Sequence, residues 1–512
     1  EMEESDWSSD VCSSDLAQTL VLDAASNIQA DAGSHGNGGE VVLWSDGETR
    51  FAGAISARGG AHSGDGGRVE VSGLRELVFQ GQVDAGAAAG QGGLLLLDPV
   101  NLWIGAPEAA VLARVLRTGT STTLQASQDI EVNAAIDGRG GRDGGGLDLS
   151  AGQDIRVNDF IVTQNGAVHL DAVAGTVTLA PGKAIFAGSG AIDISAGGDL
   201  DAGSLLTNGT LSLASRSGGV RIGAPVEAGN GDLIVRAAGD IEVAAAIVNL
   251  RAGSDVDLEA GGSIHVAAPI DGTGGVDGGT VRMVAGGGID VGTQAPAHVA
   301  TQNGAITLDA TGAINFSPDA GLYAGSGAIT LTGSQVTAGI LSGNGGMAVQ
   351  SRSGDLLLGG VMQTGGAVQL TSPTHLTVAQ PIGVTGSGSL NLNAGLDLSV
   401  DALLLASEGA SLTLTSGRDL RLNAALVSDQ GDMTLSADGS VISSAQAGLY
   451  STSGAVRVDA VQTLNAPTVM TAGAIDLSSQ SGSLRLLGQI RGGSAPVEMT
   501  AAGDIAVDQS IV

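Results

Sequence analysis

Two clusters of glycine and aspartate are the residues whose spacing most directly suggests ligand chemistry. One spans residues 138–148 (GRGGRDGGGLD) and its counterpart spans residues 272–279. Their alternation resembles half of a glycine–aspartate calcium repeat, and calcium takes about six to eight oxygen ligands. Calcium sites in β-helices are built from tandem nonapeptides, which do not occur here. We therefore interpret both clusters as turns in which glycine permits positive φ, with calcium as the open alternative.

Pairs of carboxylates could supply the acid and the base of a polysaccharide-cleaving enzyme. Asp148 with Asp154 and Asp255 with Asp257 are examples. Enzymes of that kind place two carboxylates across a groove and stack sugars on aromatic rings. The whole chain has only five Phe, two Tyr and three Trp, so an aromatic-lined sugar cleft is hard to build. We therefore expect no enzyme, and a polysaccharide-acting β-helix enzyme is the least favoured alternative.

The histidines do not predict a metal centre. No two of them have the spacing of metal ligands on one element, so we expect them on the surface or on strand faces. The sequence thus predicts no catalytic residue, no cofactor and no metal site. The six are His35, His62, His169, His265, His298 and His375.

A short repeat determines which elements carry these side chains. A glycine, any residue, and two apolar residues one position apart recur along the chain, as at Gly166, Gly190 and Gly304. The typical interval is near 21 residues, and many units contain a second strand pattern. Short strands with one apolar face bury that face only when successive coils stack. The sequence therefore predicts an all-β parallel β-helix with coils of about 21 residues.

The sequence also contains a longer repeat, which spans several coils. Residues 130–138 are echoed by 264–272, and 320–323 by 447–450. The super-repeat is therefore about 130 residues, or six coils. The Thr-Gln-Asn-Gly corners at 163–166 and 301–304 also recur, and we expect them to stack their side-chain amides.

One segment departs from the strand pattern. Residues 107–117 (PEAAVLARVLR) predict a short helix, with Pro and an acid near its start and Arg117 and Gly119 at its end. We expect its apolar stripe to lie on the solenoid wall. The division of the chain is then a β-helix over 17–105, a helix and linker over 106–119, and a repeat stalk over 120–512.

Residues 1–16 do not follow the repeat. They resemble translated sequencing-adapter sequence, so we interpret them as a non-native or disordered segment and leave them out of the fold argument. Cys12 is the single cysteine, so residues 17–512 need neither disulfides nor thiolate chemistry. A true N-terminus would then be missing, and the lack of a signal peptide says nothing about export.

The net charge and the hydropathy of the chain argue against some classes of partner. The formal net charge is −32, which argues against nucleic acid because phosphates are held mainly by Lys and Arg. No apolar run approaches the roughly 18–20 residues that a membrane helix needs. Trp44, Phe51, Phe79 and Trp103 gather in the first part of the chain, and we expect them to be core or cap residues rather than a ligand platform.

The glycine-rich part of residues 36–104 resembles the filamentous haemagglutinin family of Gram-negative exoproteins. The residues that carry the resemblance are 36–47 (GNGGEVVLWSDG), 51–60 (FAGAISARGG), 64–73 (GDGGRVEVSG) and 93–99 (GLLLLDP). The resemblance implies a right-handed β-helix at the cell surface, exported by two-partner secretion through a β-barrel transporter in the outer membrane. The family's secretion domain with its Asn-Pro-Asn motifs is not found here, and residues 120–512 match only in repeat style.

The function expected from this resemblance is that of a repeat stalk of a secreted, surface-exposed adhesin that binds cells or matrix. Its partners would be the outer-membrane transporter during export and unknown receptors on host cells, bacteria or matrix. The alternative is the stem of a contact-dependent toxin, which would carry a globular domain after the repeats.

Overall fold

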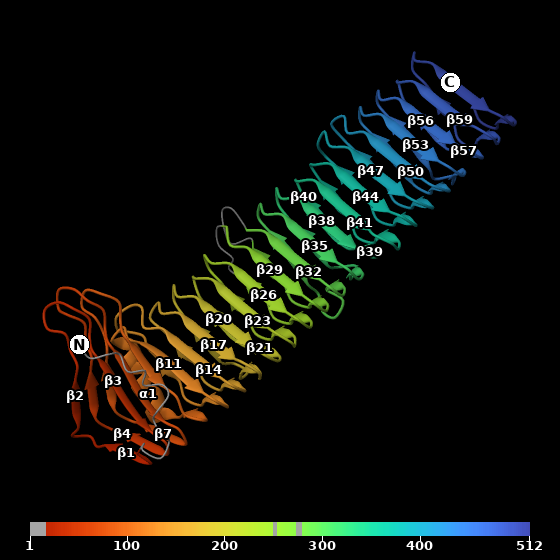
Figure 1. Ribbon diagram of the computed structural model, residues 1–512. Helices are drawn as coiled ribbons and strands as arrows, with labels where there is room; N and C mark the ends of the chain where they lie inside the picture. The colour runs from red at the N-terminus through yellow and green to blue at the C-terminus, as the bar shows by residue number, and fades with distance from the viewer. Residues whose placement is uncertain (1–16, 249–252, 273–278) are drawn as a thin grey trace, which may run out of the picture. The chain divides into compact units, whose positions relative to one another are not determined.

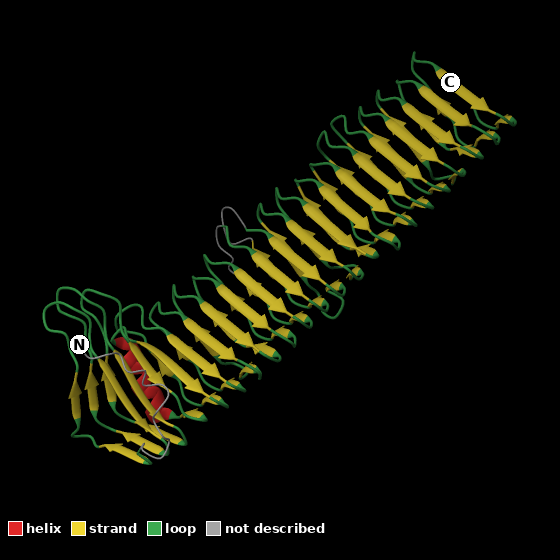
Figure 2. Ribbon diagram, in the orientation of Figure 1, coloured by secondary structure: helices red, strands yellow, loops and turns green. Residues whose placement is uncertain are grey.

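The computed structural model describes residues 17–248, 253–272 and 279–512. The chain divides into two compact units, Glu1–Gly239 and Asp240–Val512. The described part of each unit is a parallel β-solenoid with coils of about 22 residues, as the repeat predicts. Figure 1 and Figure 2 show that strands of successive coils lie side by side within each unit.

Three strands make one coil in most of the first unit, and each adds to its own parallel sheet. The first sheet contains β3 (Glu40–Ser45), β6 (Arg68–Gly73), β9 (Leu94–Leu97), β11 (Ser121–Ala126), β14 (Leu147–Ala151), β17 (Val168–Ala172), β20 (Ile192–Ala196), β23 (Leu211–Ser215) and β26 (Leu233–Ala237). The second sheet contains β10 (Leu102–Ile104), β12 (Ile130–Val132), β15 (Ile155–Val157), β18 (Val177–Leu179), β21 (Leu200–Ala202) and β24 (Val220–Ile222). The third sheet contains β13 (Ile136–Asp137), β16 (Ile161–Val162), β19 (Ala184–Phe186), β22 (Ser204–Leu206) and β25 (Val226–Glu227).

The beginning of the first unit has two small sheets of its own. One contains β1 (Thr19–Leu22), β4 (Glu48–Phe51) and β7 (Glu76–Phe79), and the other contains β2 (Asn27–Gln29), β5 (Ala54–Ser56) and β8 (Gln82–Asp84).

The second unit repeats the three-sheet coil. Its first sheet contains β29 (Val256–Ala260), β32 (Val281–Ala285), β35 (Ile306–Ala310), β38 (Ile329–Gly333), β41 (Met347–Ser351), β44 (Val368–Ser372), β47 (Leu390–Ala394), β50 (Leu412–Ser416), β53 (Met433–Ala437), β56 (Val456–Ala460), β59 (Ile475–Ser479) and β62 (Val497–Ala501). Its second sheet contains β27 (Ile241–Val243), β30 (Ile264–Val266), β33 (Ile289–Val291), β36 (Ile314–Phe316), β39 (Val336–Ala338), β42 (Leu356–Leu358), β45 (Leu376–Val378), β48 (Leu398–Val400), β51 (Leu420–Leu422), β54 (Val441–Ser443), β57 (Leu464–Ala466), β60 (Leu484–Leu486) and β63 (Ile505–Val507). Its third sheet contains β28 (Ile247–Val248), β31 (Ile270–Gly272), β34 (His298–Thr301), β37 (Gly321–Tyr323), β40 (Ile340–Gly343), β43 (Met362–Thr364), β46 (Ile382–Val384), β49 (Leu404–Ala406), β52 (Ala425–Ser428), β55 (Gly448–Ser451), β58 (Thr468–Met470) and β61 (Ile490–Arg491).

The alternation along each strand separates core from surface. In β17, Val168 and Leu170 are buried, whereas His169 between them is half-buried on the outer face. Val168 lies opposite Ile192 of β20, and Leu170 opposite Ile194, so apolar side chains form continuous rows from coil to coil. The period of two therefore fixes which residues any outside ligand can reach.

Small residues close the corner after the first sheet. Ala172 and Ala196 occupy the last inward position of β17 and β20, and Ser215 takes it in β23. The Ser215 hydroxyl donates to the carbonyl oxygen of Gly198 at 2.6 Å. A buried hydroxyl is tolerated at this corner because it has a backbone partner.

The predicted helix is confirmed as α1 (Ala106–Arg117). Pro107 lies in its first turn, and Gly119 just after it has φ of +85°. Val111, Leu112 and Val115 are buried, so the apolar stripe packs inward as expected. The helix contacts β8 of the preceding coil and β13 of the following one, where a third-sheet strand would otherwise lie. Among the helices of the described residues, none is long and apolar enough to span a membrane.

The super-repeat is visible in the strand order. Residues 130–132 form β12 and their echo at 264–266 forms β30, and both are second-sheet strands. β30 is the eighteenth strand after β12, which corresponds to six coils of three strands. Residues that correspond in the super-repeat therefore occupy the same position within the coil.

Candidate functional site

Turn carboxylates join one coil to the next. Asp154, in the turn between β14 and β15, accepts a hydrogen bond from the backbone N–H of Thr176 at 2.8 Å. Asp255 accepts one from Thr280 at 2.7 Å. The same contact links Asp129 to Asp154, Asp199 to Gly219, Asp419 to Ser440 and Asp432 to Ala455. One member of each predicted carboxylate pair therefore satisfies a backbone donor that the turn would otherwise leave unpaired.

The other member of the first pair belongs to a row on the outer face of the first sheet. Asp148, His169 and Asp193 lie in register on β14, β17 and β20. His169 Nδ1 lies 3.2 Å from Asp193 Oδ2, and this hydrogen bond raises the pKa of the imidazole. Burial raises the pKa of Asp148. The row couples the titration of successive coils, but it lies on a strand face and borders none of the grooves described below.

Two further histidines lie beside carboxylates. His265 and His375 have Nδ1 atoms 3.1 Å and 3.5 Å from carboxylate oxygens of Asp290 and Asp397. The rings of His35 and His62 stack with centroids 5.4 Å apart, although they are 27 residues apart in sequence. Within the described residues, no three His, Cys, Asp or Glu side chains are arranged to hold a metal ion.

The first glycine–aspartate cluster forms turns. Gly140 and Gly144 have φ of +80° and +97°, which glycine adopts without strain. Arg139 pairs with Asp137, and the Arg142 guanidinium donates to the carbonyl oxygen of Ala87 at 2.7 Å. Most of the counterpart cluster, residues 273–278, lies outside the described residues.

The aromatic residues of the first part divide between core and surface. Phe51 and Phe79 are buried, and their rings stack with centroids 5.5 Å apart, as expected for core residues. Trp103 is 65% exposed, so its assignment to the core or to a cap was wrong. The reason is its place on β10, where Leu102 and Ile104 on either side point inward.

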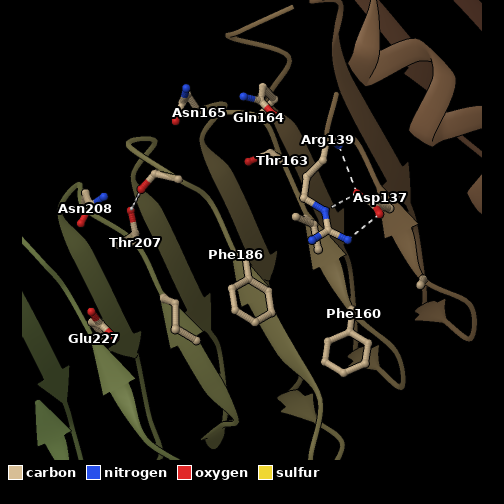
Figure 3. Close-up of a pocket in the computed structure, with 14 residues that line it drawn as sticks. Asp137, Arg139, Phe160, Thr163, Gln164, Asn165, Phe186, Thr207, Asn208 and Glu227 are labelled. Atoms are coloured by element: carbon tan, nitrogen blue, oxygen red, sulfur yellow. Dashed lines mark hydrogen bonds and ion pairs between the residues drawn. The ribbon is translucent and has the colours of Figure 1, made fainter. Parts of the chain in front are cut away.

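A groove of about 640 Å³ lies on the outer face of the third sheet in the first unit. Its floor is a row of outward residues in register on five neighbouring third-sheet strands, β13, β16, β19, β22 and β25. The order along the row is Asp137, Val162, Phe186, Leu206 and Glu227. An apolar centre is therefore flanked by a carboxylate at each end (Figure 3).

A second ring widens the apolar centre. Phe160, directly before β16, has its ring centroid 6.5 Å from that of Phe186, with 33° between the ring planes. Lys183 Nζ lies 4.7 Å from the centroid of Phe160 and 2.8 Å from Asp159 Oδ1. The cation–π contact and the ion pair hold the Phe160 ring in place at the wall of the groove. Two of the five phenylalanines thus line one groove, an arrangement that their scarcity in the sequence did not predict.

Polar side chains form the rim. Asp137 and Arg139 form two parallel side-chain hydrogen bonds of 2.9 Å and 2.8 Å, which lower the pKa of Asp137 to about 2. Gln164 and Asn165 follow β16 at the upper rim in Figure 3. Their side-chain carbonyls accept backbone N–H groups of Gly140 and Ser189 at 3.3 Å and 2.9 Å. Each amide NH₂ is left without a partner among the described residues.

The hydrogen bond from Ser189 to Asn165 bears on the predicted stacking of side-chain amides at the Thr-Gln-Asn-Gly corners. The Thr163 hydroxyl donates to the carbonyl oxygen of Gly166 at 2.5 Å, and Thr301 does the same to Gly304 at 2.6 Å. Asn165 has φ of +59° and binds the backbone of the next coil. The predicted stacking of amides was therefore wrong for Asn165, because the unpaired backbone N–H is the better-placed partner.

The groove has a smaller counterpart in the second unit. Tyr323 on β37 lines a groove of about 370 Å³ together with Gly325, Asn344 and Gln363. Phe186, Tyr323 and Tyr450 lie on β19, β37 and β55, eighteen strands or six coils apart. One ring per super-repeat therefore occupies the same outward position of a third-sheet strand.

Sequence analysis missed this site because its parts lie in different coils. Only the coil register shows that Phe160, Phe186 and Glu227 share one surface. The recurrence of 184–190 (AIFAGSG) as 321–327 (GLYAGSG) was the available signal.

Comparison with known proteins adds no assignment. No family model matches the chain, and no curated protein matches it significantly in sequence.

Proposed function

We propose that the chain is a repeat section of a secreted, surface-exposed bacterial adhesin of the filamentous haemagglutinin type. The observation that carries the proposal is the ring-bearing outward position that recurs in third-sheet strands of both units at intervals of six coils along the chain. Repetition of an outward ring has no role in filling the core, because outward side chains point away from it. It is what a surface that binds extended or repeated ligands requires.

The use of the carboxylates supports the same proposal. Asp154, Asp255 and Asp419 hold backbone N–H groups of neighbouring coils, and Asp397 holds two arginines. These acidic groups stabilise the stack of coils. The proposal therefore gives them a structural part and assigns no catalysis to the chain.

Export and location follow from the resemblance of residues 36–104. We propose two-partner secretion through an outer-membrane transporter, with the repeat section displayed outside the cell. The partners would then be that transporter during export and cell-surface or matrix receptors afterwards.

Adhesion is tested with beads coated with the full chain. The proposal predicts that such beads attach to bacterial cells, host cells or extracellular matrix above the level of beads coated with an acidic carrier protein of similar net charge. Attachment no greater than that control on all three surfaces would contradict it.

A further inference from the structure

We propose that the groove over β13, β16, β19, β22 and β25 binds a neutral polysaccharide chain that runs across successive coils. This inference deepens the proposed function, on which its biological sense rests, by naming the ligand class and the site. It concerns a surface of the first unit only, from Ala135 to Glu227.

The shape of the floor fits an extended, repetitive ligand. The row from Asp137 to Glu227 crosses five coils, which is roughly 19 Å at the usual distance between neighbouring strands. Each coil contributes one outward side chain to the row. A chain of like units lying across the strands would therefore meet a new side chain at each step.

The rings favour sugars over other extended ligands. Phe160 and Phe186 are neither buried in the core nor fully exposed, and their planes are 33° apart. A pyranose has an apolar face of C–H groups, and such faces pack on aromatic rings. The two rings would hold two units of one chain, with Val162 and Leu206 as apolar neighbours in the floor.

The rim matches hydroxyl groups. A sugar hydroxyl both donates and accepts, and the rim offers both kinds of partner. The NH₂ groups of Gln164 and Asn165 are donors, and the Glu227 carboxylate is an acceptor without a side-chain partner among the described residues. These are few, planar polar groups around an apolar centre, the composition typical of a small-molecule site.

The charges select a neutral chain. The groove is lined by two carboxylates, Asp137 and Glu227, and one guanidinium, Arg139, which is already bound by Asp137. An anionic polysaccharide or a nucleic acid would meet this rim and a formal net charge of −32. A peptide that binds by adding a strand needs an open sheet edge, and β16, β19 and β22 are paired on both sides.

The test is calorimetric titration of the full chain with three neutral probes: cellohexaose, maltohexaose and chitohexaose. We expect binding of at least one probe, with an affinity that does not change as salt is raised, because no charge on the ligand is screened. Phe186→Ala should weaken that binding by about tenfold or more, since it removes the central ring.

The controls separate the groove from general stickiness and from misfolding. Trp103→Ala removes a more exposed ring from another sheet and should change the affinity by less than about twofold. Phe186→Leu keeps an apolar side chain of similar size and should lose binding as Phe186→Ala does, with an unchanged circular dichroism spectrum. Glu227→Gln should weaken binding less than either Phe186 variant.

Three results would overturn the inference. They are no binding of any neutral probe, binding that Phe186→Ala and Phe186→Leu leave unchanged, and, when heparin is titrated as an anionic fourth probe, binding that is confined to heparin and lost at high salt. The bead experiment separates this failure from that of the proposed function. Beads that attach while all three neutral probes fail leave adhesion standing and remove the glycan groove. If the probes bind in the groove but the beads do not attach, the glycan groove stands and the proposed adhesion is contradicted.

Discussion

His169 and Asp193 face each other across neighbouring coils of the first sheet, with Nδ1 and Oδ2 3.2 Å apart. Asp148 lies on the opposite side of His169 in the preceding coil. Asp171, on the same strand as His169, pairs with Arg216. The charge of the His169 imidazole therefore acts on carboxylates of three neighbouring first-sheet strands, β14, β17 and β20.

The pH dependence of stability follows from the direction of the shift. The folded-state pKa of His169 is raised above the unfolded value of 6.5 by its hydrogen bond with Asp193. Its contribution is fully present below the unfolded pKa and is lost as pH rises through the folded pKa. The raised pKa of Asp148 acts in the same direction.

His169→Gln should therefore lower the free energy of unfolding more at about pH 6 than at about pH 8. The difference should stay below about 1 kcal/mol, since both side chains are partly exposed and solvent screens the pair. Urea denaturation at the two pH values measures it. His62→Gln is the control, because its ring stacks on His35 and has no carboxylate partner among the described residues. A larger loss at pH 8 than at pH 6 would show the sign to be wrong.

A second prediction concerns Asp397, a carboxylate of the second unit that binds two arginines. Its side chain is 11% exposed and pairs with Arg418 and, at 3.1 Å, with Arg421. The hydrogen bond from Arg418 holds the pKa of Asp397 well below its usual range. The stabilisation is therefore present at neutral pH and is lost as pH falls through the folded pKa.

Asp397→Ala should cost about 2 kcal/mol at neutral pH, because it removes the acceptor of Arg418 and of the backbone N–H of Asp419 and leaves Arg421 paired with Asp419 alone. Asp438→Ala, at an exposed turn residue, should cost less than about 0.5 kcal/mol. Equal losses in the two variants would mean that the network around Asp397 contributes nothing beyond a surface charge.

A third prediction tests the inward rows of the solenoid. Ile194 on β20 is fully buried between Leu170 and Leu213 of the neighbouring coils. Ile194→Ala should cost about 2–4 kcal/mol through the lost burial and the cavity that remains. Hydrogen exchange should rise first in β17, β20 and β23, because each coil is stabilised mainly by its neighbours.

The matched variant is Thr178→Ala on the outer face of β18, which should be close to neutral. If exchange in Ile194→Ala rose evenly over the whole first unit, the coil-by-coil account of its stability would be wrong.

The sequence predicted the coil well because one physical rule repeats. Gly166 and Gly190 start strands whose alternate residues must be buried, and β17 and β20 follow with that alternation. The helix at Ala106–Arg117 was also predictable, since its proline, acidic and basic residues and Gly119 lie where a helix begins and ends.

The groove was less predictable because register, rather than spacing, assembles it. Phe160 and Phe186 are 26 residues apart, and Phe186 lies opposite Val162, so the two rings occupy different positions along their strands. The local pattern places Phe186 outward but does not show that Val162 and Leu206 flank it. Trp103 shows the same limit, because the clustering of aromatics in sequence suggested a core and the strand period placed its ring outside.

Bead attachment, measured with and without the hexasaccharide that binds best in calorimetry, shows whether the groove is the adhesive surface. We expect the free sugar to abolish attachment of beads coated with the unmodified chain. Beads coated with Phe186→Ala should attach weakly at any sugar concentration, and those with Trp103→Ala should behave as the unmodified chain. Attachment that is equal for the Phe186→Ala and unmodified chains, and indifferent to the sugar, would contradict the claim that this groove is the adhesive surface.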